Sequence, residues 1–578
     1  MKTMILVCVT AILCTFHSFA AEGDFDIQDS VLVRYNGDGT SVVIPDTVKA
    51  IGTNAFSYRR DIISVTIPNS VIEIGANAFY YCPALTSITI PNSVIEIGAY
   101  AFSDCSALTS ITIPGSVAQI GDGAFNGCSS LATIDVAQAN AYWSSEGGIL
   151  YDKGKTVLAV FPVGKTERAF SIPSSITRIG AYAFYNCHLA SITIPNSVTA
   201  IGAYAFGYCY NLTSITVPNS VTTIGASAFQ GCRFASITLP NSVTELGASA
   251  FYYCTNLVSV TLPDAITEIG NATFERCSGL TSVTIPNSVN RIGSRAFFMC
   301  SGLASISIPH SVTQIGDYAF FMCTGLASFT IPNSVTGIGG NAFAGCNFRS
   351  VVIPNSVTRL GEAAFQNCTN LASVTLSNAM TEIGIFTFWS CSSLVSIVIP
   401  PSVTEIGWAA FGDCSSLVSV TIPASVTAIR DEAFVACSSL KNVTVDWSVP
   451  LVIRGNANLF DYVNLNRCTL NVPAGTRALY RVATVWKDFG SITEGEVSNG
   501  EMAAASAVRV SGGNLYVSSP VSERVDIYSM AGALLYSEVK PSGETVIPAG
   551  SFSGGFLIIK GSSGWTQKVF VKQNRTHI

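Results

Sequence analysis

Hydrophobic and polar positions repeat along most of this chain with a period of 23 residues. One unit reads I-P-x-S-V-T-x-I-G-x-x-A-F-x-x-C-x-x-L-x-S-I-T, and sixteen units follow this pattern. The first unit starts at Ile44, the array breaks after Val136, and it resumes at Ile172 and runs through the unit that begins at Ile422. A fixed period of about 20–50 residues is typical of a solenoid, in which every repeat forms one coil and packs against its neighbours.

The end of each unit predicts a short β-strand. In Leu85-Thr86-Ser87-Ile88-Thr89-Ile90 the apolar and polar side chains alternate, which places Ile88 and Ile90 inside and Ser87 and Thr89 outside. The spacing Leu-x-x-Ile-x-Ile also matches the strand core of a leucine-rich repeat. Proline at position 2 of the next unit ends the strand, because it cannot donate a ladder hydrogen bond. We therefore expect a leucine-rich-repeat solenoid with short parallel strands.

The remaining constant positions predict the interior of each coil, as the unit that begins at Leu239 illustrates. Phe251, at position 13, is the expected central filler, and Cys254, at position 16, follows it on a short helical turn. Gly247, at position 9, belongs to a column that is glycine in fifteen of sixteen units, for which we expect a positive φ. One coil alone cannot cover these apolar faces, whereas a stack can.

Fifteen of the eighteen cysteines occupy position 16. Equivalent residues of stacked coils lie about 4.8 Å apart with parallel side chains, whereas a disulfide needs converging Cβ atoms about 3.8 Å apart. We therefore interpret the column as buried thiols that act as small hydrophobes. Because the sequence has no CxxC motif and no Cys/His cluster, we expect no metal site and no cofactor.

Segments outside the array predict caps, an insertion and a second domain. Gly147 to Tyr151 and Thr156 to Val160 read as a hairpin joined by Asp152 to Lys155. The predicted organisation is a signal peptide (1–20), an N-terminal β cap (21–43), a first block of repeats (44–136), a hairpin insertion (137–171), a second block (172–445), a C-terminal cap (446–495), a linker (496–506) and a small all-β sandwich (507–578).

The amino-acid composition and the N-terminal segment limit the classes of function that the protein can have. Lys2, the apolar stretch from Met4 to Leu13 and the small residues near Ala20 predict secretion, and no later segment is apolar enough to span a membrane. Charged residues are only 11% of the chain, the net charge is −6, and no basic run occurs. Nucleic-acid binding is therefore disfavoured, because it requires a basic surface.

Enzyme chemistry finds no support in the sequence. The chain has four histidines and neither an HExxH nor a G-x-S-x-G motif. His310 replaces the usual Asn of a Pro-Asn-Ser turn, which indicates a surface turn residue rather than a catalytic base. We expect a protein that is not an enzyme.

Variable positions 11, 14 and 15 are the best candidates for ligand contact, because they carry aromatic residues beside the constant frame. The candidates are Tyr80, Tyr81, Tyr182, Tyr185, Tyr208, Tyr252, Tyr253, Phe298, Phe321 and Trp389. The alternative is lateral packing between neighbouring coils. The Ser and Thr residues of the strand face are nearly uniform, which favours a structural hydroxyl ladder over a specific site.

The I-P-x-S-V-x-x-I-G-x-x-A-F-x-x-C frame resembles the BspA-type, or treponemal-type, leucine-rich repeat of bacterial surface antigens. The island Gly148-Ile149-Leu150-Tyr151 and the terminal segment from Cys468 to Gly475 resemble pieces of the same family. The resemblance covers about residues 25–495 and implies secreted or cell-surface display, with adhesion to host matrix proteins or cells. It carries over no binding residue.

Residues 507–573 are similar to the C-terminal sorting domain of type IX secretion cargo, although the tail from Gln573 to Ile578 extends past the usual Lys-Val-x-Val-Lys ending. Together these features predict a surface or secreted protein-binding molecule, most simply an adhesin, with glycans as a second class of partner. The alternative is a structural surface or biofilm-matrix protein whose repeats bind one another.

Overall fold

The computed structural model describes residues 22–453 and 458–495 and seven strands between residues 507 and 571. The chain divides into two units, Met1–Glu494 and Gly495–Ile578, which are described separately. The signal peptide predicted for residues 1–20 and the linker predicted for 496–506 lie outside the described residues.

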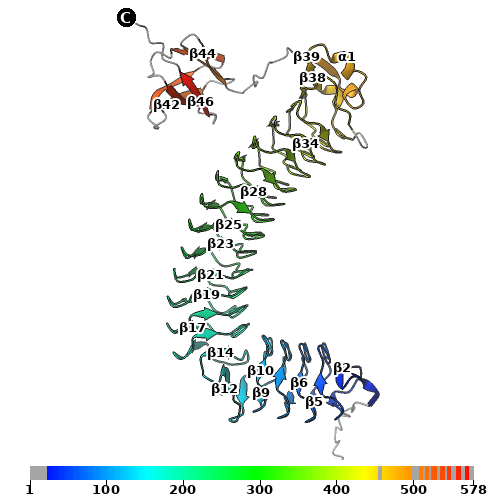
Figure 1. The fold of residues 1–578 in the computed structure, drawn as a ribbon, viewed down its shortest axis with the longest axis vertical. Coiled ribbons are helices and arrows are strands. Elements are labelled where there is room, and N and C mark those ends of the chain that lie inside the picture. Colours follow the sequence, from blue (N-terminus) through cyan, green and yellow to red (C-terminus); the bar gives the residue numbers. More distant parts are fainter. Residues whose placement is uncertain are drawn as a thin grey trace, which may run out of the picture. The chain divides into compact units, whose positions relative to one another are not determined.

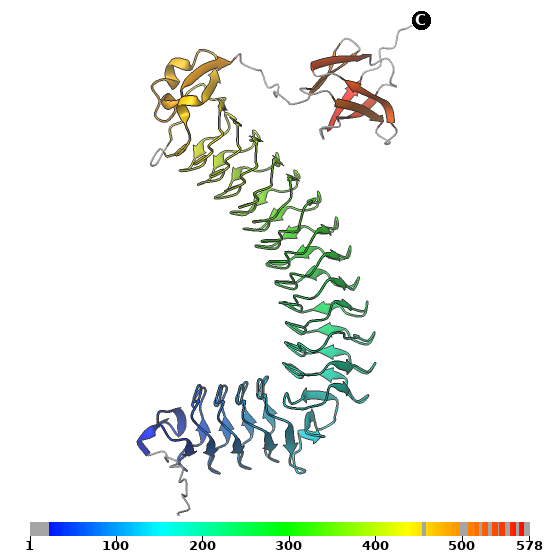
Figure 2. The same cartoon turned by 180° about the vertical axis from the view of Figure 1, so that it is seen from behind.

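The first unit is a solenoid of stacked coils, as predicted (Figures 1 and 2). Each coil carries a two-residue strand at positions 7–8 and, in most coils, a longer strand near positions 21–23. Neighbouring strands pair in parallel with equivalent residues in register, for example Val65 with Ile88. The longer strands are β3 (Ser41–Val43), β5 (Ser64–Thr66), β7 (Ser87–Thr89), β9 (Ser110–Ile113), β11 (Thr133–Val136), β15 (Ala169–Ser171), β17 (Ser191–Thr193), β20 (Ser236–Thr238), β22 (Ser259–Thr261), β24 (Ser282–Thr284), β26 (Ser305–Ser307), β29 (Ser350–Val352), β31 (Ser373–Thr375), β33 (Ser396–Val398), β35 (Ser419–Ile422) and β37 (Asn442–Val445).

The two-residue strands form a second parallel ladder on another side of the coils. They are β4 (Ala50–Ile51), β6 (Glu73–Ile74), β8 (Glu96–Ile97), β10 (Gln119–Ile120), β16 (Arg178–Ile179), β18 (Ala200–Ile201), β19 (Thr223–Ile224), β21 (Glu245–Leu246), β23 (Glu268–Ile269), β25 (Arg291–Ile292), β27 (Gln314–Ile315), β28 (Gly337–Ile338), β30 (Arg359–Leu360), β32 (Glu382–Ile383), β34 (Glu405–Ile406) and β36 (Ala428–Ile429).

The phenylalanines of position 13 form one continuous column inside each block of the solenoid. Phe251 is 0% exposed, and its ring stacks on Phe229 at 5.5 Å and on Phe274 at 5.4 Å. Burying a large apolar side chain contributes about 1.5–3 kcal/mol, and stacked rings add to this. The column therefore joins neighbouring coils into one core.

The segment from position 9 to position 16 consists of consecutive β-turns, where we expected a short helical turn. In the coil that begins at Ile90, the N–H of Ala101 donates to the carbonyl of Gly98 at 3.3 Å, and the N–H of Cys105 donates to that of Phe102 at 3.3 Å. The third residue of each turn has a positive φ, 56° at Tyr100 and 59° at Asp104, as in a type II turn. All sixteen coils share a positive φ at positions 11 and 15.

The glycines of position 9 do not have the positive φ that we expected. Close stacking explains them instead. A Cβ on Gly247 would lie 2.3 Å from the backbone nitrogen of Ala226 in the preceding coil, and one on Gly98 would lie 2.5 Å from that of Ala76. Glycine is required because backbone meets backbone at this point of the stack.

The sixteen cysteines among the described residues are buried free thiols. Fourteen of the fifteen at position 16 donate their Sγ–H to the carbonyl of the position-13 phenylalanine one coil earlier, and Cys187 donates to the carbonyl of Phe161 in the insertion. The bond from Cys277 to Phe251 is 3.0 Å long, and that from Cys254 to Phe229 is 3.1 Å. Each thiol therefore fills space and also ties its coil to the preceding one, as a weak donor.

A cap closes the N-terminal end of the array. It contains the 3-10 turn η1 (Glu22–Asp24) and the antiparallel strands β1 (Phe25–Gln28) and β2 (Val31–Tyr35). Tyr35 takes the place of the next phenylalanine, with its ring 5.4 Å from Phe56. Arg59, which replaces cysteine in the first coil, lies over the Tyr35 ring at 4.7 Å and donates to the Tyr35 carbonyl at 3.2 Å. Arg59, which departs from the repeat pattern, thus attaches the cap to the first coil through Tyr35.

The insertion forms three antiparallel strands, β12 (Trp143–Glu146), β13 (Ile149–Asp152) and β14 (Val157–Val160), of which the sequence pattern indicated the last two. Alternate residues of β13 enter different cores: Leu150 packs with the first block, and Ile149 and Tyr151 pack with the second. Strand β14 pairs in parallel with β16, so the insertion also starts the second block. The coils before and after it stack in different directions (Figure 1).

The array ends in a cap built around Trp486. The cap comprises η2 (Leu465–Arg467), β38 (Thr469–Pro473), the one-turn helix α1 (Arg477–Tyr480), η3 (Trp486–Asp488) and β39 (Ser491–Gly495). Trp486 is 0% exposed, and its indole N–H donates to the Leu451 carbonyl at 2.9 Å. Phe460 stacks on Phe434 at 5.6 Å and so closes the phenylalanine column.

The second unit is a small β-sandwich. One sheet has the order β40 (Ala507–Ser511), β41 (Asn514–Ser519), β44 (Gly543–Pro548), and the other has the order β43 (Leu534–Lys540), β42 (Glu523–Ser529), β45 (Gly555–Gly561), β46 (Thr566–Val571). All pairs are antiparallel. Leu515 and Ile547 of the first sheet share a core with Ile527 and Ile559 of the second.

Candidate binding surfaces

The turns of positions 9–16 present the aromatic candidates to solvent. Positions 11, 14 and 15 flank the buried Phe of position 13. Their side chains lie on the outside of the stack and not in the core. Tyr253 is 45% exposed, and the other nine candidates are half-buried. The sequence thus located a surface-facing set of rings correctly, and their contact with a ligand stays a prediction.

The ten candidates do not form one stripe. They fall into five groups, most of which include further aromatic residues beside the candidates. The groups are Tyr80 and Tyr81 with Tyr58; Tyr182, Tyr185 and Tyr208 with Tyr100 and Tyr204; Tyr252 with Tyr253; Phe298 and Phe321 with Tyr318; and Trp389 with Phe386 and Trp408.

Packing between neighbouring coils accounts for part of each group. Tyr182 stacks on Tyr204 at 4.8 Å with an angle of 6°, and Phe298 stacks on Phe321 at 4.9 Å with an angle of 10°. Each pair occupies one repeat position in adjacent coils. Lateral packing therefore orders these rings, and such rigid aromatic groups are also the side chains that dominate protein interfaces.

Glycines explain where several rings lie. Tyr100 lies over Gly123 of the next coil, where a Cβ would come within 2.7 Å of the ring. Tyr208 over Gly231 and Trp389 over Gly412 repeat this arrangement, with 2.6 Å and 2.4 Å. A side chain at those glycines would displace the ring, so the glycine belongs to the aromatic surface.

Tyr58 and Tyr318 are members of these groups that sequence reasoning missed. They occupy positions 15 and 11, the same positions that identified the other candidates, so the signal was present. Arg60 and Arg295 were also missed. Arg60 lies over the Tyr81 ring at 5.0 Å, and Arg295 lies over Phe298 at 5.4 Å and over Tyr318 at 5.6 Å.

The strand face does not contain the structural hydroxyl ladder that we expected. Within residues 22–453, two of its hydroxyl groups form hydrogen bonds, Ser64 to Ser41 at 3.0 Å and Thr444 from Asn471 at 3.2 Å. The ladder runs instead along the threonines of position 6, where for example Thr199 donates to the Thr177 carbonyl at 3.2 Å. The strand face is thus mostly a surface of hydroxyl groups that point to solvent, interrupted by residues such as Asp135, Val352 and Val398.

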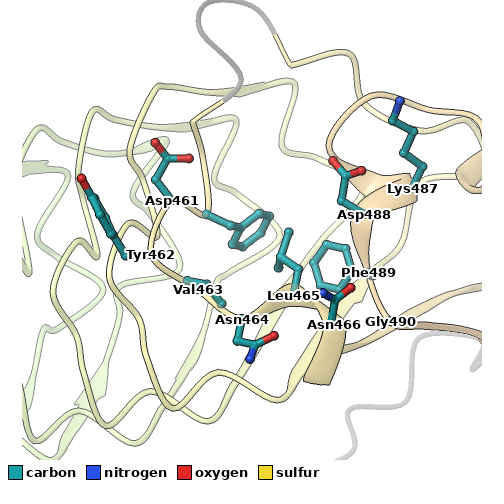
Figure 3. A pocket seen from close by; sticks show the side chains of 11 residues that line it. Asp461, Tyr462, Val463, Asn464, Leu465, Asn466, Lys487, Asp488, Phe489 and Gly490 are labelled. Atoms are coloured by element: carbon teal, nitrogen blue, oxygen red, sulfur yellow. The ribbon is translucent and has the colours of Figure 1, made fainter.

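A hollow of about 750 Å³ lies on the C-terminal cap, lined by residues 460–466 and 487–490 (Figure 3). Asp461 and Asp488 stand on opposite sides of it. Its other polar groups are the exposed side chains of Asn464, Asn466 and Lys487. Because the two carboxylates lie on opposite sides of the hollow, its lining offers no close acid and base pair suited to catalysis.

The part of the chain that the structure describes contains neither a candidate metal site nor a candidate membrane-spanning helix. There, no three His, Cys, Asp or Glu side chains gather so that they could hold a metal ion. None of the described helices is long and apolar enough to cross a bilayer.

Comparison with known proteins identifies the family. Residues 32–146, 165–258, 222–348 and 336–466 match the model of the BspA type leucine rich repeat region. This chain belongs to the BspA-type leucine-rich repeat family. The match points to no catalytic family, and a leucine-rich-repeat solenoid is typically a binding scaffold.

Several solved structures are similar to this BspA-type chain. A leucine-rich repeat protein from Bacteroides ovatus is 29% identical, with 75% of this chain and 92% of that chain covered and a TM-score of 0.48. One from Eubacterium ventriosum is 27% identical (55% and 88% covered, TM-score 0.44), and a leucine rich cell surface protein from Faecalibacterium prausnitzii is 26% identical (74% and 94% covered, TM-score 0.30). No curated protein matches the chain.

Proposed function

We propose that this BspA-type protein is a secreted or cell-surface adhesin that binds proteins of the host matrix or of other cells. One observation carries the proposal: rigid, half-exposed aromatic groups are spaced along a solenoid whose remaining surface is polar but nearly uncharged. Tyr and Trp supply most of the energy in protein interfaces because they bury a large area at a small entropic cost. Glycans, which also stack on aromatic rings, are a second class of partner.

A binding screen tests this proposal. The full chain without residues 1–20 is titrated against immobilised extracellular-matrix proteins and a glycan array. The test variant changes Tyr252, Tyr253, Phe298 and Phe321 to Ser, and the control changes the exposed apolar residues Val352 and Val398 of the strand face to Ser. Saturable binding that the first variant loses and the second keeps supports the adhesin. Loss in the control alone would move the site to the strand face, and no binding by a folded chain contradicts the proposal.

The second candidate is a structural surface or matrix protein whose arrays bind one another. The uniform strand face favours it, because identical hydroxyl rows on two copies can meet without charge repulsion. Sedimentation velocity over a hundredfold concentration range distinguishes the two: self-association without any other partner supports the structural role, and a monomer throughout excludes it.

We also propose that the second unit directs export and surface attachment, as its likeness to type IX sorting domains implies. Its separation from the array as an independent sandwich supports this role. Deletion of residues 507–578 in the native host is expected to leave the protein inside the cell envelope, measured by fractionation. Unchanged surface display would contradict the role.

A further inference from the structure

One aromatic group differs from the rest in its surroundings. We call Tyr100, Tyr182, Tyr185, Tyr204 and Tyr208 the tyrosine cluster. Tyr100 comes from the coil before the last one of the first block, and the other four come from the second block. The Tyr100 and Tyr182 hydroxyl groups are 2.5 Å apart across the insertion.

Tyr182 and Tyr204 of the tyrosine cluster are stacked, whereas other pairs of its rings meet at steep angles. Tyr185 meets Tyr208 at 90° with centroids 5.5 Å apart, and Tyr100 meets Tyr182 at 80° with centroids 5.6 Å apart. Because the rings are half-buried and turned against one another, the cluster presents ring faces in more than one direction. Such an arrangement suits a cation, which is attracted to the negative face of each ring.

Asp104 follows Tyr100 by four residues in the same turn segment, and its carboxylate acts electrostatically on Tyr185. Asp104 packs over Gly127, where a Cβ would be 2.0 Å from its Oδ1. Its side chain accepts a hydrogen bond of 3.4 Å from the neighbouring Ser103, and no lysine or arginine among the described residues pairs with it. Burial raises the pKa of Asp104, and the pKa of Tyr185 is raised first by burial and then by its neighbours Tyr208 and Asp104.

Arginines of the chain cover some of its other surface rings, although among the described residues none covers the groups of Tyr252 and Trp389. Arg60 lies over Tyr81 at 5.0 Å, Arg233 over Tyr210 at 4.9 Å, and Arg295 over Phe298 and Tyr318. In the part of the chain that the structure describes, no arginine or lysine lies over any of the five rings of the tyrosine cluster, and Arg233 covers only the adjacent Tyr210, whose ring is 5.8 Å from that of Tyr208. The cluster thus combines two groups that favour a positive charge, aromatic faces and a half-buried carboxylate, and the chain supplies none.

We infer that the tyrosine cluster and the Asp104 carboxylate form a binding site for an arginine or lysine side chain of the partner protein. The inference rests on the proposed function, because it assigns the chemistry by which the adhesin recognises a protein. A cation relieves the cost of the desolvated carboxylate, which a neutral sugar cannot do. The guanidinium group of arginine also stacks on aromatic rings, so arginine is the preferred ligand.

Saturation-transfer NMR on the full chain tests the site, with a pentapeptide that carries one central arginine and with the same peptide carrying citrulline. Citrulline keeps the shape of the side chain and removes its charge. The arginine peptide is expected to bind saturably, about tenfold more tightly than the citrulline peptide. Equal affinity for both peptides would overturn the inference.

Two isosteric variants make the test specific. Asp104→Asn is expected to weaken the arginine peptide about tenfold. Asp413→Asn is the matched control, since Asp413 occupies position 15 in a later coil, is also half-buried, and accepts a hydrogen bond from Ser390 at 2.7 Å. Asp413→Asn should leave peptide binding unchanged. Tyr185→Leu, which keeps apolar volume but removes the ring, should weaken binding in a chain whose melting temperature confirms that it is folded.

The outcomes separate this inference from the proposed function. If a matrix protein binds and Asp104→Asn does not weaken it, the inference is wrong and the adhesin stands. If the arginine peptide binds and no protein does, the cation site stands and the adhesin loses its support. A neutral oligosaccharide that competes at the tyrosines and is insensitive to Asp104→Asn would reassign the cluster to glycans.

Discussion

The rings of Phe251 and Phe274 lie parallel, with an angle of 1° between their planes and 5.4 Å between their centroids. They belong to adjacent coils, and both are completely buried. Phe251→Ala would leave a cavity that touches two coils at once, because Phe229 stacks on the other face of the ring. We expect a loss of about 3–5 kcal/mol in the free energy of unfolding, measured by urea denaturation followed by circular dichroism.

The control for this substitution lies in the same coil. Tyr253 is 45% exposed, so Tyr253→Ala removes a ring of similar size from the surface. Its effect should stay below about 1 kcal/mol. If Phe251→Ala cost as little as Tyr253→Ala, the phenylalanine column would not be the core of the solenoid.

Two glycines of position 9 should respond differently to alanine. A Cβ on Gly247 would meet backbone atoms at 2.3 Å, whereas on Gly270 its nearest neighbour would be the Thr273 hydroxyl at 3.3 Å. Gly247→Ala should therefore force the coils apart and cost about 1–3 kcal/mol, and Gly270→Ala should be nearly neutral. Melting temperatures of the two variants test the prediction, which requires that Gly247→Ala melt at the lower temperature.

The positive φ of position 11 predicts a stabilising glycine. Ala272 has a φ of 54°, a conformation that costs an L-residue about 1 kcal/mol or more. Ala272→Gly removes this strain and should raise the free energy of unfolding by several tenths of a kcal/mol after the entropic cost of glycine. Ala248→Gly, at position 10, where φ is not positive, should lower it. The same sign for both substitutions would contradict the assigned turn geometry.

Much of the fold could be predicted because every coil is built from the same repeat pattern. The residues around Phe251 recur in every unit, so a single interpretation of strand, core and outward positions applied to all sixteen. The short type II turns could not be predicted, since position 11 holds residues as different as Tyr100, Ala272 and Arg295 and gives no glycine signal. The role of Gly247 was also misjudged, because the distance between coils is a property of the stack and is not encoded in one unit.

The candidate site shows the same limit. Repeat position correctly indicated that the aromatic side chains face outward, but it could not show which of them touch. A ring contact depends on the residue in the same column of the next coil, as with Tyr100 over Gly123. Asp104 carries no motif, and its importance follows only from its electrostatic effect on Tyr185, which lies 81 residues away in the sequence and beyond the insertion.

The column of thiols predicts that the array loses stability in alkali. Burial raises the pKa of Cys323 to about 12, whereas the thiol of an unfolded chain ionises near pH 9. Below pH 9 the thiol is protonated in both states, and its contribution is fully present. Between about pH 9 and 12 the unfolded state releases the proton and the folded state keeps it, so unfolding is favoured by about 1.4 kcal/mol per pH unit for each such cysteine.

Cys323→Ala isolates this effect from the titration of tyrosines and lysines. The variant loses packing at every pH, but its stability should fall less steeply than that of the wild type above pH 9, by about 1 kcal/mol between pH 9 and 10. Urea midpoints measured under reducing conditions from pH 8 to 10 test this. Parallel pH profiles for the two proteins would mean that Cys323 is ionised as easily in the folded coil as in the unfolded chain, and so is not sealed from water.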